Sequence, residues 1–359
     1  MSAILLARNI RRFDTAATFE GIGSARMADE GIALWRDHTG WASMGPLAAI
    51  PRIPKLLSTM WKTAAHIGVT NPDLVVLVDF GAFNLRLARE LRVNKKYPGP
   101  ILDVFPPATW LDDEKRAREV SAYTVPLTAF EHQYLFYKSH RLPVVYFGHP
   151  LAGQYAQRPP RDAPPFDAGA VALLPGSRAG ELKYHLPVLA AAYKLLKSRR
   201  PHLHGIFGAA NDAAAAKIRG AIARERLADV VIERGVAHAI ENADAAWVAS
   251  GTAVLEATLL GVPSVALYII SPILVRHARR VYAGKYITLP NLIVGRELVP
   301  ELLQDDATPQ RLAAAMESVL ADPSRQYDSF DEMRRRLGPP DALESCAKFC
   351  VALAKVGSG

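Results

Sequence analysis

The sequence predicts an α/β protein with a doubly wound parallel sheet in each of two halves, and three observations support this. Short apolar runs alternate with helix-period stretches through nearly all of the 359 residues. The runs are apolar on both faces, as parallel strands covered by helices are. A proline-rich, helix-poor segment, residues 153–169, separates the two halves and is the best candidate for an interdomain linker.

Seven apolar runs are expected to form strands, with helices such as 83–93 and 187–200 between them. The runs are residues 73–81, 143–149, 170–176, 203–210, 228–235, 244–251 and 263–269. With the linker as the boundary, the predicted domains are residues 1–160 and 161–335, followed by a C-terminal helix over 336–359. Ligands of such proteins bind at the carboxyl ends of the strands, in the cleft between domains.

The composition favours an anionic partner. Lysine and arginine outnumber the acids 43 to 35, which gives a net charge of +8, and only 22% of residues are charged. Such an excess suits nucleic acid, a phosphorylated substrate or an acidic membrane surface. Nucleic acid is set aside because the basic residues are scattered over helices and lack an interleaved aromatic platform.

Cysteine usage and hydropathy indicate a cytoplasmic protein. Cys346 and Cys350 lie four residues apart in a predicted helix, too far apart for a disulfide, and are expected to be reduced packing residues. The apolar core of residues 4–7 is too short for a secretory signal. The uncharged run 257–275 is interrupted by glycine and proline, so we expect the end of a helix and a buried strand rather than a membrane span.

Residues 248–265 contain a strand end, a Ser250-Gly251-Thr252 turn and a helix with Glu256 near its start. Free N–H groups at a helix start bind phosphate, and a carboxylate one turn later can accept from two vicinal ribose hydroxyls. The structural alternative is a capped helix, with Ser250 or Thr252 as the N-cap and Glu256 complementing the helix dipole.

A second strand–turn–helix, residues 169–196, allows the same two interpretations. Its turn needs only Pro175 and Gly176, yet it also carries Arg178 and, soon after, Glu181. Arg178 can form a two-pronged hydrogen bond to a phosphate, or it can simply cap the helix and pair with Glu181. Two such turns at the ends of different strands favour a nucleotide site with Arg178 on the diphosphate.

Several segments resemble the lipid-A-disaccharide synthase family. They are "LLPGSRAGELKYHLPVLAAA", "ASGTAVLEATLLGVPSVALY", "YITLPNLIVGRELVPELLQDDATPQRLA" and "GHPL", with "GIGSARMADEG", "MGPLAAIPRIPKLL", "PDLVVLVDFGAFNLRLAREL" and "AFEHQYLFY" upstream. The resemblance covers nearly the whole chain. It implies a glycosyltransferase-B fold, in which two Rossmann-like domains bind acceptor (1–160) and UDP-sugar (161–335) with the active site between them.

The resemblance further implies inverting transfer of diacylglucosamine from UDP-diacylglucosamine to diacylglucosamine 1-phosphate, with release of UDP. No metal or other cofactor is expected, because a basic side chain and a helix N-terminus can take the charge of the leaving diphosphate. By motif position, Arg178 contacts the diphosphate, the 250–252 turn binds phosphate and Glu256 holds the ribose. Asn291 lines the donor pocket, and Arg296 with Glu297 supports it or forms only a salt bridge.

The N-terminal half departs from the family pattern. The family's first strand and its Gly-Glu-x-Ser-Gly-Asp loop have no counterpart, since residues 4–27 match the helix and strand that follow that loop. Either the start was assigned too late or part of the acceptor site is absent. The family's Asp-Ala-Pro-Asp-Phe-Asn reads "DFGAFN" here, which keeps Asp79 but replaces the second acid with Ala82. The segment 104–112 and the residue after "GHPL" also diverge.

Asp79 is the candidate general base. It follows a predicted strand, where an acceptor hydroxyl would meet the donor, and a carboxylate there can take the hydroxyl's proton. The alternative is a capping or hydrogen-bonded structural aspartate. His149 is a weaker candidate, because a lone histidine at an apolar strand end more often bonds the backbone.

Two segments mix apolar and basic residues in the way that suits an anionic bilayer surface, residues 271–287 and 50–68. The alternative for 50–68 is an ordinary amphipathic helix packed on its own domain. We therefore expect a protein peripherally associated with the cytoplasmic side of the inner membrane, whose partners are the acylated substrates and anionic lipid. A homodimer stays open.

Two rival interpretations remain at this point. One is a catalytically impaired relative that still binds a nucleotide sugar or lipid, as the missing loop and Ala82 suggest. The other is a same-fold enzyme with a different substrate, such as a UDP-sugar epimerase.

Overall fold

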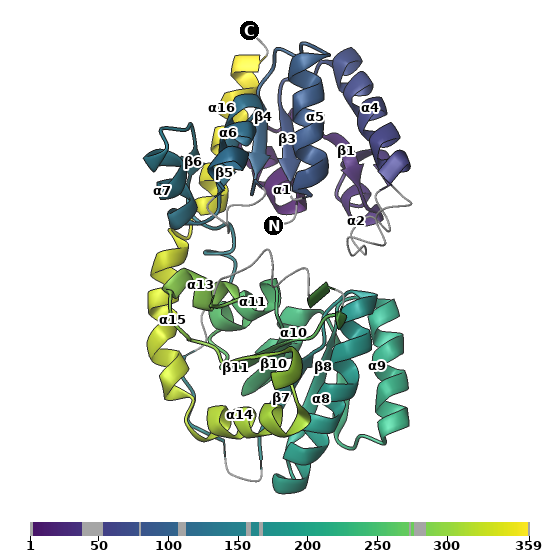
Figure 1. Cartoon of the computed structure of the whole chain (residues 1–359), viewed down its shortest axis with the longest axis vertical. Helices are drawn as coiled ribbons and strands as arrows, with labels where there is room; N and C mark the ends of the chain where they lie inside the picture. The colour runs from purple at the N-terminus through teal and green to yellow at the C-terminus, as the bar shows by residue number, and fades with distance from the viewer. Residues whose placement is uncertain are drawn as a thin grey trace. The chain divides into compact units, whose positions relative to one another are not determined.

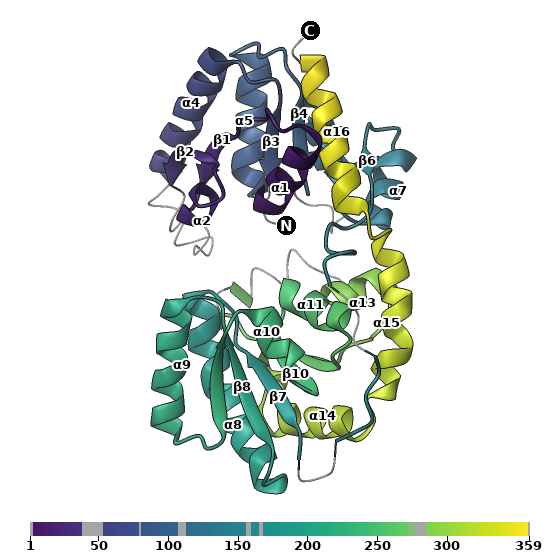
Figure 2. The same ribbon diagram turned by 180° about the vertical axis from the view of Figure 1, so that it is seen from behind.

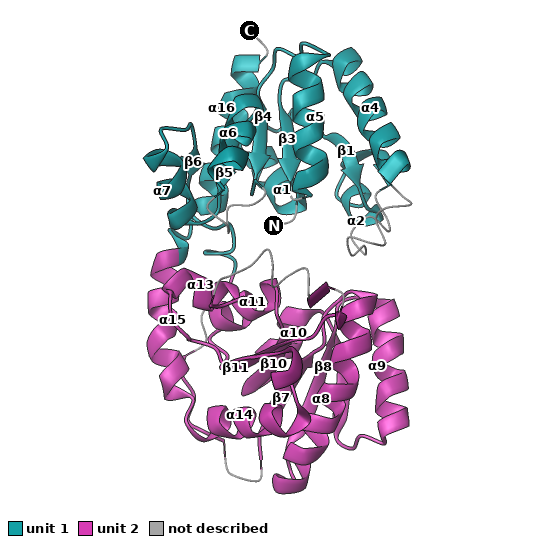
Figure 3. Cartoon of the chain, viewed as in Figure 1, with its two compact units in different colours: residues 1–154, 337–359 teal, residues 155–336 magenta. Residues whose placement is uncertain are grey.

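The structure is a computed structural model that describes residues 3–37, 53–78, 80–106, 113–155, 159–164, 168–272, 274–275 and 285–357. The chain forms two compact units (Figure 3), one of residues 1–154 with 337–359 and the other of residues 155–336. Relative to the predicted ranges, the first unit ends six residues earlier, before Tyr155, and it includes the C-terminal helix.

The second unit is built on a six-stranded, all-parallel sheet in the order β12-β11-β10-β7-β8-β9. Its strands are β7 (Ala170–Leu174), β8 (His204–Ala209), β9 (Val230–Arg234), β10 (Ala245–Ala249), β11 (Ser264–Tyr268) and β12 (Glu301–Leu303). Five of them fall within predicted runs. Strands β7, β8, β10 and β11 are largely buried and apolar, as strands covered on both faces are, whereas β9 is partly exposed. Strand β12 was not predicted.

Helices cover this sheet on both faces. Helices α8 (Ala179–Arg199), α9 (Asp212–Glu225) and α14 (Pro309–Ala321) pack side by side on one face (Figure 1). The other face carries α10 (Val236–Glu241), α11 (Thr252–Leu260) and α13 (Leu289–Val294), and α15 (Ser324–Leu337) follows α14. Trp247 of β10 is fully buried in the core, where its indole N–H donates to the carbonyl of Leu312 at 3.1 Å. This core fixes the strand that precedes the Ser250 turn.

The first unit contains two parallel sheets. One pairs β1 (Glu20–Gly23) with β2 (Ala33–Asp37), and the other has the order β3-β4-β5-β6. The remaining elements are β3 (Val75–Val78), β4 (Ile101–Val104), β5 (Val125–Thr128) and β6 (Val145–Tyr146), with α1 (Ala3–Phe13), α2 (Ala25–Ala28), α4 (Ile53–Thr70), α5 (Gly81–Val93), α6 (Glu114–Tyr123), α7 (Glu131–Ser139) and α16 (Ala342–Gly357). Strand β6 is much shorter than the predicted run 143–149, and β1, β2, β4 and β5 were not predicted.

Strand β1 packs against the same hydrophobic cores as β3, but the two strands are not hydrogen-bonded to each other. Ile22 of β1 packs against the core formed with α4 and α5, and Phe19, just before β1, packs against the core formed with α1 and α16. Residues of β3 contribute to both cores. Among the described strands, however, β1 pairs only with β2, and β3 pairs only with β4.

Two smaller predictions are confirmed. Cys346 and Cys350 are buried free thiols in α16, and burial raises the pKa of each to about 12. The apolar run 257–275 contains the end of α11, a turn at Gly261 (φ +74°) and strand β11. Within the described residues, no helix is long and apolar enough to cross a bilayer.

Candidate functional site

The two predicted turns follow neighbouring strands of the second unit's sheet. Leu173 of β7 lies opposite Trp247 of β10, and Leu174 lies opposite Val248. The strand order reverses between these two strands, with β8 and β9 on one side and β11 and β12 on the other, and Figure 2 shows β7, β8 and β10 side by side. In open α/β sheets, ligands bind at the carboxyl ends of strands where the order reverses. The turns that carry Arg178 and Ser250 therefore lie at this switch point.

The first turn is held by Glu181. Its Oε2 accepts from the backbone N–H of Ser177 (2.9 Å) and of Arg178 (3.1 Å), while its Oε1 accepts from Nη1 of Arg178 (2.8 Å). Gly176 has φ +97°, and a Cβ there would lie 2.4 Å from Oε2 of Glu181, so only glycine fits. The arginine side chain is 62% exposed. Glu181 thus caps α8 and orients Arg178 while most of the guanidinium stays accessible.

Buried His185 ties this turn to the end of β11. Its ring is fully buried, with Nδ1 2.9 Å from the carbonyl of Pro175 and Nε2 3.0 Å from the amide N of Ile269. The carbonyl needs a donor and the amide an acceptor, which fixes a neutral ring with the proton on Nδ1. Burial lowers the pKa of His185, although the bond to Pro175 opposes this shift. Sequence reasoning missed this residue, although it stands in "LKYHLP".

We expect His185→Phe to lower the free energy of unfolding by about 2 kcal/mol, because the carbonyl of Pro175 and the amide of Ile269 lose their partners. Urea unfolding at pH 7 measures this change. The unfolded chain binds a proton at His185 near pH 6.5, whereas the folded chain resists it. Stability of the wild type should therefore fall as the pH drops below that value, and part of this slope should be absent in the variant. Equal stability and equal slopes would contradict the assignment.

The second turn leads into α11 without a side-chain cap. The helix begins at Thr252, and its N-cap is Gly251 rather than Ser250 or Thr252; within the part of the chain that the structure describes, no side chain caps it. Gly251 and Thr252 are exposed, and no atom lies within 4 Å of the position a Cβ would take on Gly251. Uncapped N–H groups at the start of a nine-residue helix are ready donors for an anion.

Glu256 lies one turn into α11 and is half-buried. Burial raises the pKa of its carboxyl, while a hydrogen bond from the hydroxyl of Tyr155 opposes that shift. The partner Tyr155 was not predicted, because it stands about a hundred positions away in the sequence. The carboxylate therefore has an internal partner in addition to the ribose that the resemblance assigns to it.

Asn291 is fully buried, and its amide is used within its own segment. Its Oδ1 accepts from the amides of Leu298 (2.7 Å) and Val299 (2.9 Å), and its Nδ2 donates to the carbonyl of Val299 and to Oε1 of Glu301, both at 2.8 Å. Asn291 thus shapes the backbone between α13 and β12. Its expected place in the donor pocket stays a prediction.

Arg296 forms a salt bridge, but its partner is not Glu297. Its Nη2 lies 2.5 Å from Oε2 of Glu332 and its Nη1 3.1 Å from Oγ of Ser329, both on α15. Glu297 is exposed. Support of the donor pocket by Arg296 and Glu297 also stays a prediction.

In the first unit, the structure describes only part of the predicted site. Asp79 and residues 38–52 and 107–112 lie outside the described residues. In the second unit, so do residues 273 and 276–284 of the predicted membrane segment 271–287. His149 is buried, and its Nδ1 accepts from the amide of Leu151 at 3.1 Å. Burial lowers the pKa of His149 to about 3, so this neutral ring bonds the backbone as the simpler interpretation expected.

Comparison with known proteins identifies the family. Residues 2–352 match the family model described as lipid-A-disaccharide synthetase. This chain belongs to the lipid-A-disaccharide synthase family. It is 34% identical over 346 residues to the lipid-A-disaccharide synthase of Pseudomonas aeruginosa (strain UCBPP-PA14), which covers 94% of this chain and 90% of that protein. It is 33% identical over 368 residues to that of Myxococcus xanthus (strain DK1622), which covers 99% and 94% respectively.

Solved structures with low sequence identity share the fold of this lipid-A-disaccharide synthase family member. A putative UDP-N-acetylglucosamine 2-epimerase from Listeria monocytogenes superposes with a TM-score of 0.61 at 13% identity, over 95% of this chain and 89% of that chain. A glycosyltransferase from Rickettsia africae superposes with a TM-score of 0.54 at 10% identity, over 98% and 95%. The predicted α/β fold of the glycosyltransferase-B type is confirmed, and family membership makes the chain a glycosyltransferase.

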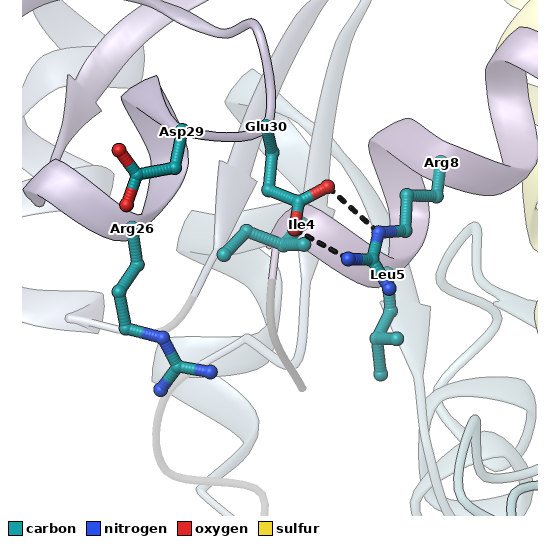
Figure 4. A pocket seen from close by; sticks show the side chains of 6 residues that line it. All are labelled: Ile4, Leu5, Arg8, Arg26, Asp29 and Glu30. Atoms are coloured by element: carbon teal, nitrogen blue, oxygen red, sulfur yellow. Dashed lines mark hydrogen bonds and ion pairs between the residues drawn. The ribbon is translucent and has the colours of Figure 1, made fainter.

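The first unit of this family member also has a cavity of about 300 Å³ between α1 and residues 26–30 (Figure 4). Ile4, Leu5 and Arg8 of α1 line one side, and Arg26, Asp29 and Glu30 line the other. Arg8 and Glu30 form a two-pronged ion pair, with Nε 2.8 Å from Oε2 and Nη2 bonded to Oε1. These residues were not singled out from the sequence, although the segment "GIGSARMADEG" contains three of them.

Proposed function

We propose that this lipid-A-disaccharide synthase family member transfers diacylglucosamine from UDP-diacylglucosamine to diacylglucosamine 1-phosphate and releases UDP. The observation that carries the proposal is the pair of adjacent turns at the switch point between β7 and β10. One presents an oriented, accessible Arg178, and the other presents the uncapped start of α11. Both supply positive potential to the same edge of the sheet, as a diphosphate requires.

In this proposal the donor half of the reaction depends on electrostatics. Arg178 and the 250–252 turn hold the diphosphate, and Glu256 accepts hydrogen bonds from the ribose. Negative charge develops on the departing UDP as the glycosidic bond breaks, and donors fixed in advance stabilise it. The internal hydrogen bonds of Glu181 and His185 hold the turn that carries Arg178, so little rearrangement of this donor is needed during the reaction.

Asp79 provides the acceptor half of the mechanism. It removes the proton of the attacking hydroxyl as that oxygen bonds to the anomeric carbon from the face opposite UDP, so the configuration inverts. Arg296, Glu297 and Asn291 support the donor pocket through the segment between α13 and β12.

Turnover with a radiolabelled donor tests the proposal. The chain is incubated with UDP-diacylglucosamine and diacylglucosamine 1-phosphate, and the disaccharide and UDP are both quantified. Equal amounts of both products support it. UDP release without disaccharide, or UDP-sugar epimerisation, would assign another activity to the site, and a chain that binds UDP without any turnover would be a nucleotide-binding relative.

We propose further that α4 contacts the membrane from which acylated substrates are drawn. Its inner side buries Met60 and Ala64, whereas Trp61 and Val69 on the outer side are exposed by 54% and 85%. Ile53, at the start of the helix, is exposed by 45%. Lys55 and Lys62 are also exposed on this helix. Exposed large apolar side chains with cations beside them suit an anionic lipid surface.

Trp61→Glu should weaken binding to vesicles of anionic phospholipid about tenfold, because it removes an aromatic anchor and adds a repelled charge. Vesicle co-sedimentation measures the partition. Leu135→Glu is the matched control, since Leu135 is 56% exposed on α7 and is not part of α4. Equal loss of binding in the two variants, or none in either, would remove α4 from the proposal.

A further inference from the structure

Tyr268 is the last residue of β11, the strand next to β10 in the sheet of the second unit (Figure 1). Leu267 lies opposite Ala249, so the two parallel strands end at the same level. Strand β10 leads into the 250–252 turn, and β7, on its other side, leads into the turn that carries Arg178. Three successive strands therefore present Tyr268, the 250–252 turn and Arg178 at one edge of the sheet.

The ring of Tyr268 is held beside the Arg178 turn through His185. The centroids of the two rings lie 5.8 Å apart. The same imidazole bonds the amide of Ile269, the next residue along β11, at 3.0 Å and the carbonyl of Pro175 at 2.9 Å. The backbone after Tyr268 and the backbone just before Arg178 are thus separated by one imidazole ring and two hydrogen bonds.

The hydroxyl of Tyr268 is a donor that the fold does not use. The residue is half-buried, and its hydroxyl makes no hydrogen bond to any of the residues that the structure describes. Burial raises the pKa of Tyr268, with the charge of Glu181 adding to the shift and that of Arg178 opposing it, so the hydroxyl stays protonated. A protonated phenol can donate to a phosphate oxygen. Because this donor is neutral, it adds no charge repulsion to Arg178.

We infer that Tyr268 is a third group that binds the diphosphate: its hydroxyl donates to a phosphate oxygen of UDP beside Arg178 and the start of α11. This inference rests on the proposed function of the Arg178 turn. His185 holds the backbone next to both groups, so the phenol and the guanidinium keep a fixed separation, as preorganised donors to one diphosphate require. Sequence reasoning did not select Tyr268, because it stands in the apolar run 263–269, where an aromatic residue indicates packing.

The test is calorimetry of the full chain with UDP and with uridine, which has the same base and ribose but no phosphate. Tyr268→Phe removes the hydroxyl and keeps the ring against His185. UDP should bind this variant about tenfold more weakly than the wild type, because a hydrogen bond to a charged acceptor is lost. Uridine should bind both proteins equally, which also shows that the second unit of the variant is folded.

Tyr327→Phe is the matched control. Tyr327 is also half-buried, its ring centroid lies 5.8 Å from that of Phe330, and its hydroxyl likewise has no hydrogen bond to a described residue. It stands on α15 rather than at the end of a strand. This variant should therefore bind UDP like the wild type.

Three outcomes would overturn the inference, and they are distinguishable. If Arg178→Ala loses UDP affinity but Tyr268→Phe keeps it, the diphosphate site stands and the role of Tyr268 is wrong. If Tyr268→Phe weakens UDP and uridine equally, the hydroxyl bonds the nucleoside rather than the diphosphate. If Arg178→Ala binds UDP like the wild type, the diphosphate assignment fails and the inference fails with it.

Discussion

Asp79→Asn is expected to lower turnover by about 10²- to 10⁴-fold, the usual contribution of a general base. Asparagine keeps the size and hydrogen-bonding shape of the side chain but cannot take a proton at neutral pH. Because Asp79 acts on the acceptor hydroxyl in the proposed mechanism, UDP affinity should stay unchanged. The measurements are disaccharide formation at saturating substrates and calorimetry with UDP.

Asp113→Asn is the matched control for this experiment. Asp113 is the N-cap of α6, where its Oδ1 accepts from the amide of Arg116 at 3.0 Å, and asparagine caps helices equally well. This variant should turn over like the wild type. Full activity of Asp79→Asn would remove Asp79 as the base. Loss of UDP binding in the same variant would instead point to a structural role for this aspartate.

Arg178→Ala should weaken UDP binding about a hundredfold, with kcat/KM for the donor falling by at least as much, because a charge-assisted contact to the diphosphate is lost. The start of α8 should survive, since Glu181 would still accept from the backbone N–H of Ser177 and of residue 178. The variant is therefore expected to fold normally. Calorimetry with UDP and with uridine measures the effect, and uridine, which has no phosphate, should bind as it does to the wild type.

Arg199→Ala is the control for charge. Arg199 lies at the other end of α8, pairs with Glu317 at 2.7 Å and is also exposed, so its loss changes the net charge equally without touching the turn. Exposed pairs of this kind contribute little to stability. Arg178→Lys should be intermediate, because lysine keeps the charge but not the fork geometry. A wild-type UDP affinity in Arg178→Ala would refute the diphosphate assignment.

The sequence predicts the second unit's sheet better than the first unit's because the two differ in strand composition. Strands β7, β8, β10 and β11 are buried and apolar, so their runs are visible in the sequence. Strand β1 reads Glu-Gly-Ile-Gly and β2 reads Ala-Leu-Trp-Arg-Asp, so neither gives a pattern of period two or a long apolar run. The strands of the first unit are buried by helices distant in the sequence, and the periodicity of a strand's own residues does not indicate such burial.

The candidate site likewise contains some residues that the sequence indicates and others that it does not. Arg178, Glu181 and the 250–252 turn follow strand ends and stand in local motifs, so residue types and spacing indicate them. His185 and Tyr155 act through partners 84 and 101 residues away, Ile269 and Glu256. No local pattern distinguishes them from ordinary packing residues. Asn291 is the reverse case, since its motif suggests a ligand while its bonds in the structure are internal.

The separation of β1 from β3 has a consequence for the folding cooperativity of the first unit. The β1–β2 ribbon is attached through side chains, such as His66 of α4 paired with Glu20 (3.0 Å) and stacked on Trp35, and by the bonds of Arg11 on α1 to the carbonyls of Glu30 and Gly31. With no hydrogen-bond ladder from β1 to β3 in the described strands, the ribbon can detach while β3, β4 and β5 stay paired. Its amides should therefore exchange with solvent through a local opening of lower free energy, which makes the ribbon a foldon of its own.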